Sequence, residues 1–243
     1  SRMATGHFVQ TNAQGELLRG ADPNKDQSYF LYMLHDEQLK KAMFPVGHMT
    51  KAEVRAIAEA HGLINSKKKD STGVCFIGER NFRQFLQGFL PMQPGDMRTE
   101  DGKKVGEHIG LSYYTLGQRK GLGVALGKPA YVIKLNPQKN TVMLGDVEEL
   151  KAEHMLTEPP LWVNEAEAMK SQKLTVRIRY RSQPIPCEVK PLEDGRLLVH
   201  FLTEASAVTP GQSAVFYIGD RVVGGAFIAN QKGVGYLAES LGG

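Results

Sequence analysis

The sequence predicts an α+β protein of more than one domain, with helices before Pro91 and antiparallel strands over residues 160–235. Its 243 residues suffice for one large domain or two small ones. Hydrophobic residues make up 41% and charged residues 23%, which excludes a largely disordered chain. After Pro91 the hydrophobic period changes from helical to alternating, and glycine and proline become frequent.

Three segments before Pro91 are expected to be helical. Residues 50–62 carry the clearest pattern, because Thr50 and Glu53 can form a capping box and Gly62 stands where a helix stops. Residues 27–34 follow a helix-start signal at residues 22–24. Residues 82–90 place phenylalanine and leucine at helical spacing, which we interpret as core packing.

Short β-type runs flank turn signals in the second half. Residues 131–135 and 141–144 flank Asn136-Pro137, residues 189–192 and 196–201 flank Asp194-Gly195, and residues 214–218 and 222–228 flank Gly219-Asp220. Residues 160–235 are therefore expected to form a small antiparallel barrel or sandwich. Residues 148–160 are expected to be a linker.

Composition excludes several classes of protein. No apolar run approaches the ~18 residues of a membrane-spanning helix, and residues 1–4 lack the apolar stretch of a secretory signal. Two cysteines exclude a disulfide scaffold and a four-cysteine zinc site, and no histidine lies at a metal-ligand spacing from them. We expect a cytoplasmic protein with neither a metal nor a membrane partner.

Basic residues suggest a polyanionic partner. The net charge is +4, and residues 64–128 alone carry 11 Lys and Arg against 6 Asp and Glu. Residues 174–181 alternate strictly, so Arg177, Arg179 and Arg181 would line one face of a strand, facing either nucleic-acid phosphates or solvent. The loop 114–123, with two cations and three glycines, is a second candidate for a ligand contact.

The two cysteines differ in their surroundings. Cys75 lies between Gly73 and Gly78, after three lysines, and nearby positive charge stabilises a thiolate. It is either a nucleophile able to carry sulfur or a buried, inert thiol between Val74 and Phe76. Cys187 stands at the start of a predicted strand, and we interpret it as structural.

Taken together, six segments in order resemble the tRNA-specific 2-thiouridylases, which put sulfur on the wobble uridine of certain tRNAs. The segments are ATGH (4–7), NKDQSYFL (24–31), FPVG (44–47), KKKDSTGVCFIGER (67–80), GEHIG (106–110) running into YTLGQR (114–119), and TPGQSAVFY (209–217). They cover nearly the whole chain.

The resemblance implies three domains. Residues 1–82 would be the helical tail of a PP-loop α/β nucleotide domain that carries the sulfur-carrier cysteine. Residues 83–155 would be a small β-rich central domain, and residues 156–243 a C-terminal antiparallel β-barrel. Members of the family use ATP to adenylate the uridine, and a cysteine persulfide then supplies the sulfur as AMP leaves. The implied partners are tRNA and either a sulfur-relay donor protein or a cysteine desulfurase.

The resemblance also assigns residues to roles. Cys75 matches the sulfur-carrying cysteine, and Gly6 matches a nucleotide-contacting glycine. The implied tRNA contacts are His7, Lys25, Asp26, Gln27, Arg179, Tyr180 and Gln212.

One family motif does not occur in the sequence. The Ser-Gly-Gly-x-Asp-Ser adenylation loop is absent from the 243 residues, and Cys187 lies in the barrel segment rather than where the partner of Cys75 belongs. We therefore expect the isolated chain to be inactive in ATP-dependent thiolation. The alternatives are a non-catalytic short form that binds tRNA, and an unrelated β-rich domain with a core cysteine.

Overall fold

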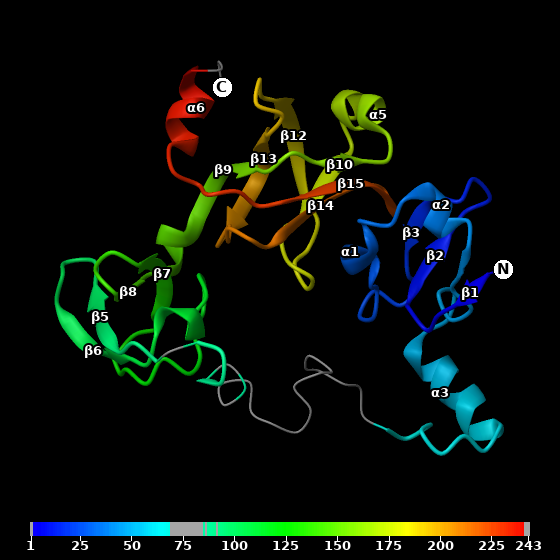
Figure 1. Cartoon of the computed structure of the whole chain (residues 1–243), viewed down its shortest axis with the longest axis horizontal. Helices are drawn as coiled ribbons and strands as arrows, with labels where there is room; N and C mark the ends of the chain where they lie inside the picture. The colour runs from blue at the N-terminus through cyan, green and yellow to red at the C-terminus, as the bar shows by residue number, and fades with distance from the viewer. Residues whose placement is uncertain (1, 69–84, 86, 91, 241–243) are drawn as a thin grey trace. The chain divides into compact units, whose positions relative to one another are not determined.

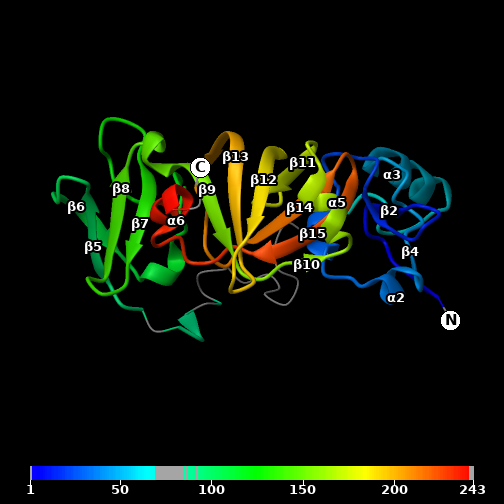
Figure 2. The ribbon, with the colours of Figure 1, turned by 90° about the horizontal axis from the view of Figure 1, so that it is seen from above.

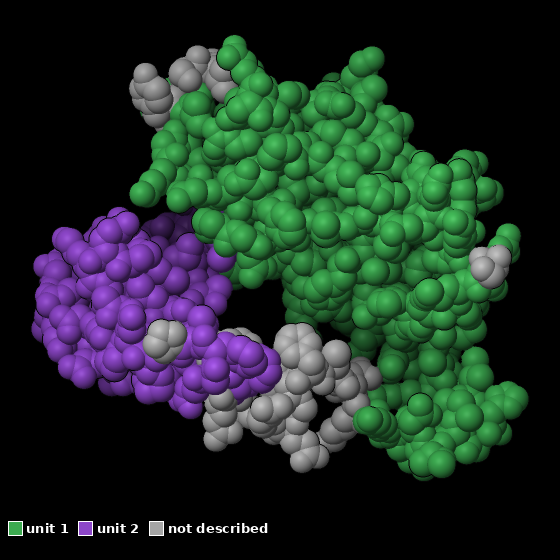
Figure 3. Space-filling model, viewed as in Figure 1, with its two compact units in different colours: residues 1–68, 153–204, 210–243 green, residues 69–152, 205–209 purple. Residues whose placement is uncertain are grey.

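The chain divides into two compact units that are drawn in separate colours in Figure 3. The computed structural model describes residues 2–68, 85, 87–90 and 92–240. The first unit comprises residues 1–68, 153–204 and 210–243, and the second comprises residues 69–152 and 205–209. The N-terminal segment and the C-terminal segments thus fold together, although the central part of the chain separates them in sequence.

A single sheet dominates the first unit. Its strands are ordered β2-β3-β15-β14-β11-β12-β13-β9, and β10 pairs with β15 outside this path. Figure 2 shows these strands gathered side by side. Their bounds are Val9–Thr11 (β2), Leu17–Arg19 (β3), Lys151–Thr157 (β9), Leu161–Trp162 (β10), Leu174–Arg177 (β11), Ile185–Pro191 (β12), Leu197–Ser206 (β13), Ser213–Ile218 (β14) and Arg221–Phe227 (β15).

The sheet closes on itself, as the sequence predicts for a small barrel. Thr157 at the end of β9 bridges Ile228 just after β15, and the Ala229 amide donates to the Leu156 carbonyl at 2.9 Å. Closure removes the unpaired edges that an open sheet would expose. The hairpins expected at Asp194-Gly195 and Gly219-Asp220 are present between β12 and β13 and between β14 and β15.

The N-terminal segment adds a hairpin to this barrel instead of forming only helices. β2 pairs with β3, and Leu18 of β3 pairs with Arg221 of β15. The Asn12 side chain accepts from the amides of Gln14 and Glu16, and Gly15 has a φ of 82°. The expectation of a helical tail therefore missed a turn signal in which Asn and Gly supply the tight bend. Two short parallel strands, Met3–Ala4 (β1) and Ala42–Met43 (β4), complete this segment.

Helices in the first unit are short except for one (Figure 1). The helix expected over residues 50–62 is confirmed as α3, Lys51–Ala60, with the predicted capping box between Thr50 and Glu53 and Gly62 at a φ of 66°. The helix expected over residues 27–34 is confined to α1, Ser28–Leu31, and a turn follows in which the Leu34 amide donates to the Leu31 carbonyl at 3.0 Å. The other helices are Asp36–Leu39 (α2), Glu165–Lys170 (α5) and Val234–Ser240 (α6).

Tyrosines of the N-terminal segment pack on the barrel. Tyr29 and Tyr32, three residues apart on one face of α1, share a core cluster with Val215 and Tyr217 of β14. A Cβ at Gly225 would lie 2.3 Å from the Tyr32 ring. The glycine in β15 therefore makes room for this tyrosine.

The expected linker over residues 148–160 is wrong, because most of it is β9. Met155, Leu156 and Thr157 are buried, and Leu156 packs with Val234 and Ala238 of α6. This strand closes the barrel by pairing with residues that are distant in the sequence. The residues next to it in the chain therefore do not indicate a strand.

The second unit is built on a four-stranded sheet of order β6-β5-β8-β7. Its strands are Gly95–Thr99 (β5), Lys104–His108 (β6), Tyr131–Asn136 (β7) and Thr141–Gly145 (β8), with 3-10 turns at Leu111–Tyr113 and Val147–Leu150. The hairpin expected at Asn136-Pro137 joins β7 and β8. Its core contains Met97, Val132, Val142 and Leu144.

No helix in the described ranges combines the length and the apolar character needed to cross a bilayer. Within the helix expected over residues 82–90, the structure describes residues 85 and 87–90. Phe89 is 72% exposed and Leu90 is 37% exposed, so the interpretation as core packing is wrong for these two side chains.

Candidate functional site

A buried ion pair joins the N-terminal segment to the barrel. Arg177 Nη1 donates to Asp26 Oδ2 at 2.9 Å, and the two side chains are 6% and 1% exposed. Asp26 Oδ2 also accepts from Arg19 Nε at 3.4 Å, while Oδ1 accepts from the amides of Gly20 and Ser28 at 3.1 and 3.0 Å. Two cations and two amides thus compensate the desolvation of the carboxylate.

Arg177 also holds the turn that follows β11. Its Nε donates to the Ser182 carbonyl at 3.1 Å, and Nη2 donates to the Tyr180 carbonyl. One guanidinium therefore fixes the positions of Asp26 and of the Arg179-Tyr180 turn relative to each other. Its planar, five-donor fork suits this better than an ammonium group would.

The predicted arginine face is wrong for this reason. β11 ends at Arg177, and Arg177 is buried, whereas Arg179 is half-buried and Arg181 is exposed in the turn. The alternation of residues 174–181 predicts a longer strand. The Arg177 side chain leaves that pattern because it satisfies a buried carboxylate and two carbonyls, which local sequence does not show.

His7 and Gln27 belong to adjoining backbone segments. The Phe8 amide donates to Gln27 Oε1 at 2.9 Å, and the Gln27 amide donates to the Phe8 carbonyl at 3.0 Å. His7 Nδ1 lies 2.6 Å from Thr5 Oγ1, and the His7 side chain is half-buried. This reciprocal pair places the predicted contact at His7 beside the segment 25–27.

Ser213, the residue after Gln212, is joined to the same region through two tyrosines. Tyr29 Oη donates to the Ser213 carbonyl at 2.8 Å, and Ser213 Oγ lies 3.3 Å from Tyr32 Oη. Burial raises the pKa of Tyr29 to about 12, so its hydroxyl remains a donor at neutral pH. All seven predicted tRNA contacts lie in the first unit, namely His7, Lys25, Asp26, Gln27, Arg179, Tyr180 and Gln212.

Among these residues, Lys25 and Arg179 supply the positive charge. Burial lowers the pKa of Arg179, but a guanidinium stays protonated at pH 7. The carboxylate of Asp26 is enclosed by protein donors, so it faces neither solvent nor a ligand. Its place in this group is therefore that of an anchor for the loop that carries Lys25 and Gln27.

The structure describes the predicted nucleotide contact but not the predicted sulfur carrier. Gly6 is exposed between β1 and β2, and a Cβ built there would meet no heavy atom within 4 Å. Its backbone is therefore open to a ligand that needs close approach, such as the nucleotide that the resemblance implies. Cys75 lies outside the described residues.

Cys187 is buried in β12 opposite Phe201 and is 2% exposed. Burial raises the pKa of its thiol to about 12 from an ordinary value of 9.0. The folded state therefore favours the neutral thiol, and the stability that this confers is present below pH 9 and is lost between pH 9 and 12.

We expect Cys187→Ser to lower the free energy of unfolding by about 1 kcal/mol at pH 7. The difference in the free energy of unfolding between variant and wild type should shrink as the pH rises above 9. The thiol of Cys187 then ionises more readily in the unfolded state, which lowers the stability of wild type but not that of the variant. Urea unfolding at pH 7, 9 and 10 measures both effects. A difference that grows with pH would contradict the assignment.

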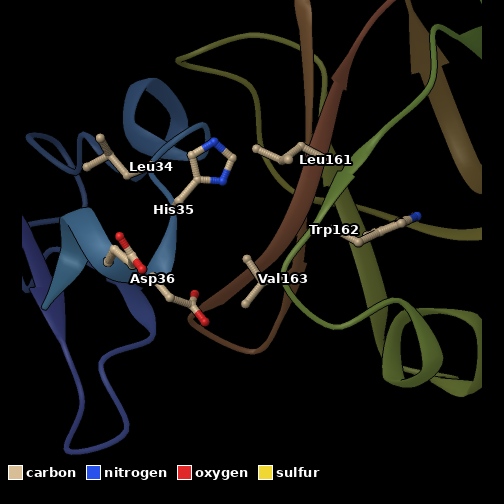
Figure 4. A pocket seen from close by; sticks show the side chains of 7 residues that line it. Leu34, His35, Asp36, Leu161, Trp162 and Val163 are labelled. Carbon is tan, nitrogen blue, oxygen red and sulfur yellow. The ribbon is translucent and has the colours of Figure 1, made fainter.

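A pocket of about 280 Å³ lies elsewhere in the first unit. It is lined by Leu34, His35, Asp36, Glu37, Leu161, Trp162 and Val163. Figure 4 shows the Trp162 side chain directed away from Asp36. None of the predicted contact residues lines it, and two carboxylates would repel a phosphate, so it is separate from the site above.

The loop at residues 114–123 folds onto its own unit. The Gly117 amide donates to the Val132 carbonyl at 2.8 Å, and the Val132 amide donates to the Gln118 carbonyl at 2.9 Å. Arg119 and Lys120 are exposed.

Within the ranges that the structure describes, no three His, Cys, Asp or Glu side chains are grouped to hold a metal ion.

Comparisons with known proteins first define a class. Residues 1–79 match the model of the tRNA methyl transferase HUP domain, residues 83–146 that of the tRNA methyl transferase PRC-barrel domain, and residues 152–228 that of the aminomethyltransferase beta-barrel domain. The chain therefore has the domain composition of a tRNA-modifying protein with a HUP domain followed by two β-rich domains.

Individual relatives then give the family. The chain is 52% identical to tRNA-specific 2-thiouridylase MnmA 3 of Bacteroides fragilis over 98% of its own length and 68% of the relative. It is 49% and 48% identical to the MnmA proteins of Histophilus somni and Haemophilus influenzae, over 94% of this chain and 63% of each relative. The chain belongs to the tRNA-specific 2-thiouridylase family, and it spans about two thirds of the length of these relatives.

Sequence reasoning missed three residues of this site and placed a fourth, Arg177, on an exposed face. Arg19 and Arg177 hold the loop 22–27, and Tyr29 and Phe30 lie directly after it. The signal for the tyrosine and the phenylalanine was present, because both fall in the family-like run 24–31. The pairing of Arg177 with Asp26 spans 151 residues and had no local signal.

Proposed function

We propose that this chain forms the tRNA-binding and sulfur-carrying part of a tRNA 2-thiouridylase, which replaces the C2 oxygen of the wobble uridine by sulfur. The observation that supports this most is the hydrogen-bonded network around Arg177 and Asp26. It gathers the segments 7–8, 25–27, 179–180 and 212–213, which carry the implied tRNA contacts. In this proposal residues 1–82 belong to the nucleotide domain, 83–155 to a central domain and 156–243 to the barrel.

The proposed chemistry divides between ATP and Cys75. ATP would activate the uridine by adenylating its C2 oxygen. The terminal sulfur of a persulfide on Cys75 would then form a bond to C2, and the C2–oxygen bond would break as AMP leaves. The thiolate of the partner cysteine, in the part of the enzyme outside this chain, would attack the Cys75 sulfur and break the persulfide S–S bond, which leaves the sulfur on the uridine and a disulfide between the two cysteines. A thiol reductant would then restore both cysteines. A sulfur-relay protein or a cysteine desulfurase would load Cys75. The exposed backbone at Gly6 would contribute to nucleotide binding.

The sequence lacks the Ser-Gly-Gly-x-Asp-Ser loop that would hold the ATP phosphates. We therefore propose that the 243-residue chain alone binds tRNA but does not thiolate it. A second candidate is a short form that binds tRNA without modifying it. If the reading frame continues upstream into the adenylation loop, the chain is part of the enzyme. A genuine start at Met3 would favour the short form.

Binding of tRNA tests the proposal directly. We expect the chain to bind a tRNA transcript with an affinity that falls as salt rises, because bound cations are released from the phosphates. Lys25→Ala should weaken binding and reduce the slope of log Kd against log salt by about 1. Lys232→Ala, an exposed lysine beyond β15, is the matched control and should change neither value. Equal losses from both variants would contradict a localised contact.

A further inference from the structure

Three aromatic rings form a cluster at the edge of the proposed tRNA surface. The ring centroids of Phe30 and Tyr180 are 4.4 Å apart at an interplanar angle of 38°, and Tyr29 meets Phe30 edge to face at 5.6 Å. Tyr29 is buried and Tyr180 is half-buried, whereas Phe30 is 55% exposed. The cluster is thus buried on one side and open on the other.

The fold holds Phe30 outward. Tyr29 and Tyr32 occupy the face of α1 that packs on the barrel, so Phe30, at an intermediate helical position, points elsewhere. An exposed phenyl ring forgoes burial that would stabilise the fold.

The two tyrosines that contact Phe30 are each anchored by hydrogen bonds. The Tyr180 carbonyl accepts from Arg177, whose side chain is buried against Asp26. Tyr29 is anchored by its bond to the Ser213 carbonyl. Phe30 therefore rests on a rigid base, and stacking of a ligand on it would cost little side-chain entropy.

Charge around the cluster favours an anion-bearing ligand. Arg179 adjoins Tyr180 in the chain, and Lys25 lies in the loop that leads into α1. The nearby carboxylate of Asp26 is paired with two arginines. An aromatic face flanked by cations is the combination that binds an unpaired base and its phosphates.

We propose that the exposed face of Phe30 is a stacking platform for an unpaired base of the bound tRNA, with Tyr180 packed behind the ring. This rests on the proposed function and extends it, because it adds Phe30 as a residue that contacts a base rather than a phosphate. Stacking accepts any base, so the platform contributes affinity and positioning without reading sequence.

Substitution of Phe30 separates stacking from charge. Phe30→Leu keeps an apolar side chain but removes the π face, and should weaken tRNA binding about 5- to 50-fold with an unchanged salt slope. Phe30→Trp should bind within about twofold of wild type, and the introduced indole should lose fluorescence on binding, measured against the Trp162 background of wild type. Phe227→Leu, at a ring 47% exposed on β15, is the matched control.

Each result decides the matter. Because Phe30 is exposed, both of its variants should unfold within about 0.5 kcal/mol of wild type, which urea titration checks. Wild-type affinity in Phe30→Leu, with Lys25→Ala still weakened, would overturn the platform and leave the proposed function standing. No binding of tRNA by wild type would overturn both. Unchanged tRNA affinity with slower sulfur loading from a desulfurase would show that the ring binds a protein instead.

Discussion

Arg177→Met is expected to lower the free energy of unfolding by about 3 kcal/mol. Methionine keeps most of the aliphatic volume but leaves the Asp26 carboxylate buried without its closest cation and the Tyr180 and Ser182 carbonyls without a donor. Loss of one partner of a buried ion pair costs roughly 3–5 kcal/mol. Arg19 Nε, which lies 3.4 Å from Asp26 Oδ2, remains in the variant. The expected loss of stability is therefore at the lower end of this range.

A double-mutant cycle tests whether the pair is the cause. Asp26→Asn should also destabilise, because it leaves the Arg177 charge buried, and the double variant should cost clearly less than the two single losses added together. Urea unfolding followed by the fluorescence of the single tryptophan, Trp162, provides the measurement. Arg181→Met, at the exposed end of the same turn, is the control and should stay within about 0.5 kcal/mol of wild type.

The same variants distinguish positioning from phosphate contact. A buried Arg177 should affect tRNA affinity only by displacing the Arg179-Tyr180 turn, so the salt slope of binding should stay unchanged. If Arg177→Met were as stable as wild type and reduced that slope by about 1, the guanidinium would face phosphate. The exposed arginine face expected from the alternation would then be right and the buried pair wrong.

Cys75→Ser is expected to abolish sulfur transfer in an enzyme that contains the adenylation loop, while tRNA affinity stays within a few-fold. A serine hydroxyl cannot form a persulfide, so no sulfur is available to the activated uridine. Cys187→Ser is the matched control, because its buried thiol is neutral at physiological pH and should leave transfer intact. Equal loss of activity from both variants would contradict this division of roles.

Sulfur loading tests the carrier step in this chain by itself. Incubation with a cysteine desulfurase and its substrate, without ATP or tRNA, should add sulfur to Cys75 and none to Cys187, read by peptide mass spectrometry. Sulfur on Cys187 would mean that the barrel opens enough to expose β12. Sulfur on neither would show that Cys75 is not a carrier in the isolated chain, and its proposed role would then depend on the rest of the enzyme.

Local sequence was sufficient where an element depends on neighbouring residues. The capping box of α3 needs only Thr50 and Glu53, three residues apart, and both sides of the box form as predicted. The hairpins at Asp194-Gly195 and Gly219-Asp220 need only a turn residue that tolerates positive φ, and Gly195 and Gly219 have φ values of 84° and 62°. Such interactions are determined by chain chemistry over a few residues.

The sequence-based prediction was wrong where the structure of a segment depends on a strand that is distant in the chain. β9 was expected to be a linker, yet it is a strand because the barrel needs it to close against Ile228. β2 and β3 were expected to belong to a helical segment, yet they extend the sheet beside β15. Pairing energy comes from strands elsewhere in the chain, so local composition carries little of it.

The sequence by itself was sufficient to assign the family and to name the residues expected to contact tRNA. It also supported the hypothesis that one cysteine is reactive and the other structural. Only the tertiary structure decided how these residues are held: Asp26 and Arg177, 151 residues apart, are buried together and organise the segments that carry Lys25, Gln27, Arg179 and Tyr180. The physical reason is that a charged side chain that folding removes from water is stable only when it is paired with an opposite charge. Spacing along the chain does not record that pairing.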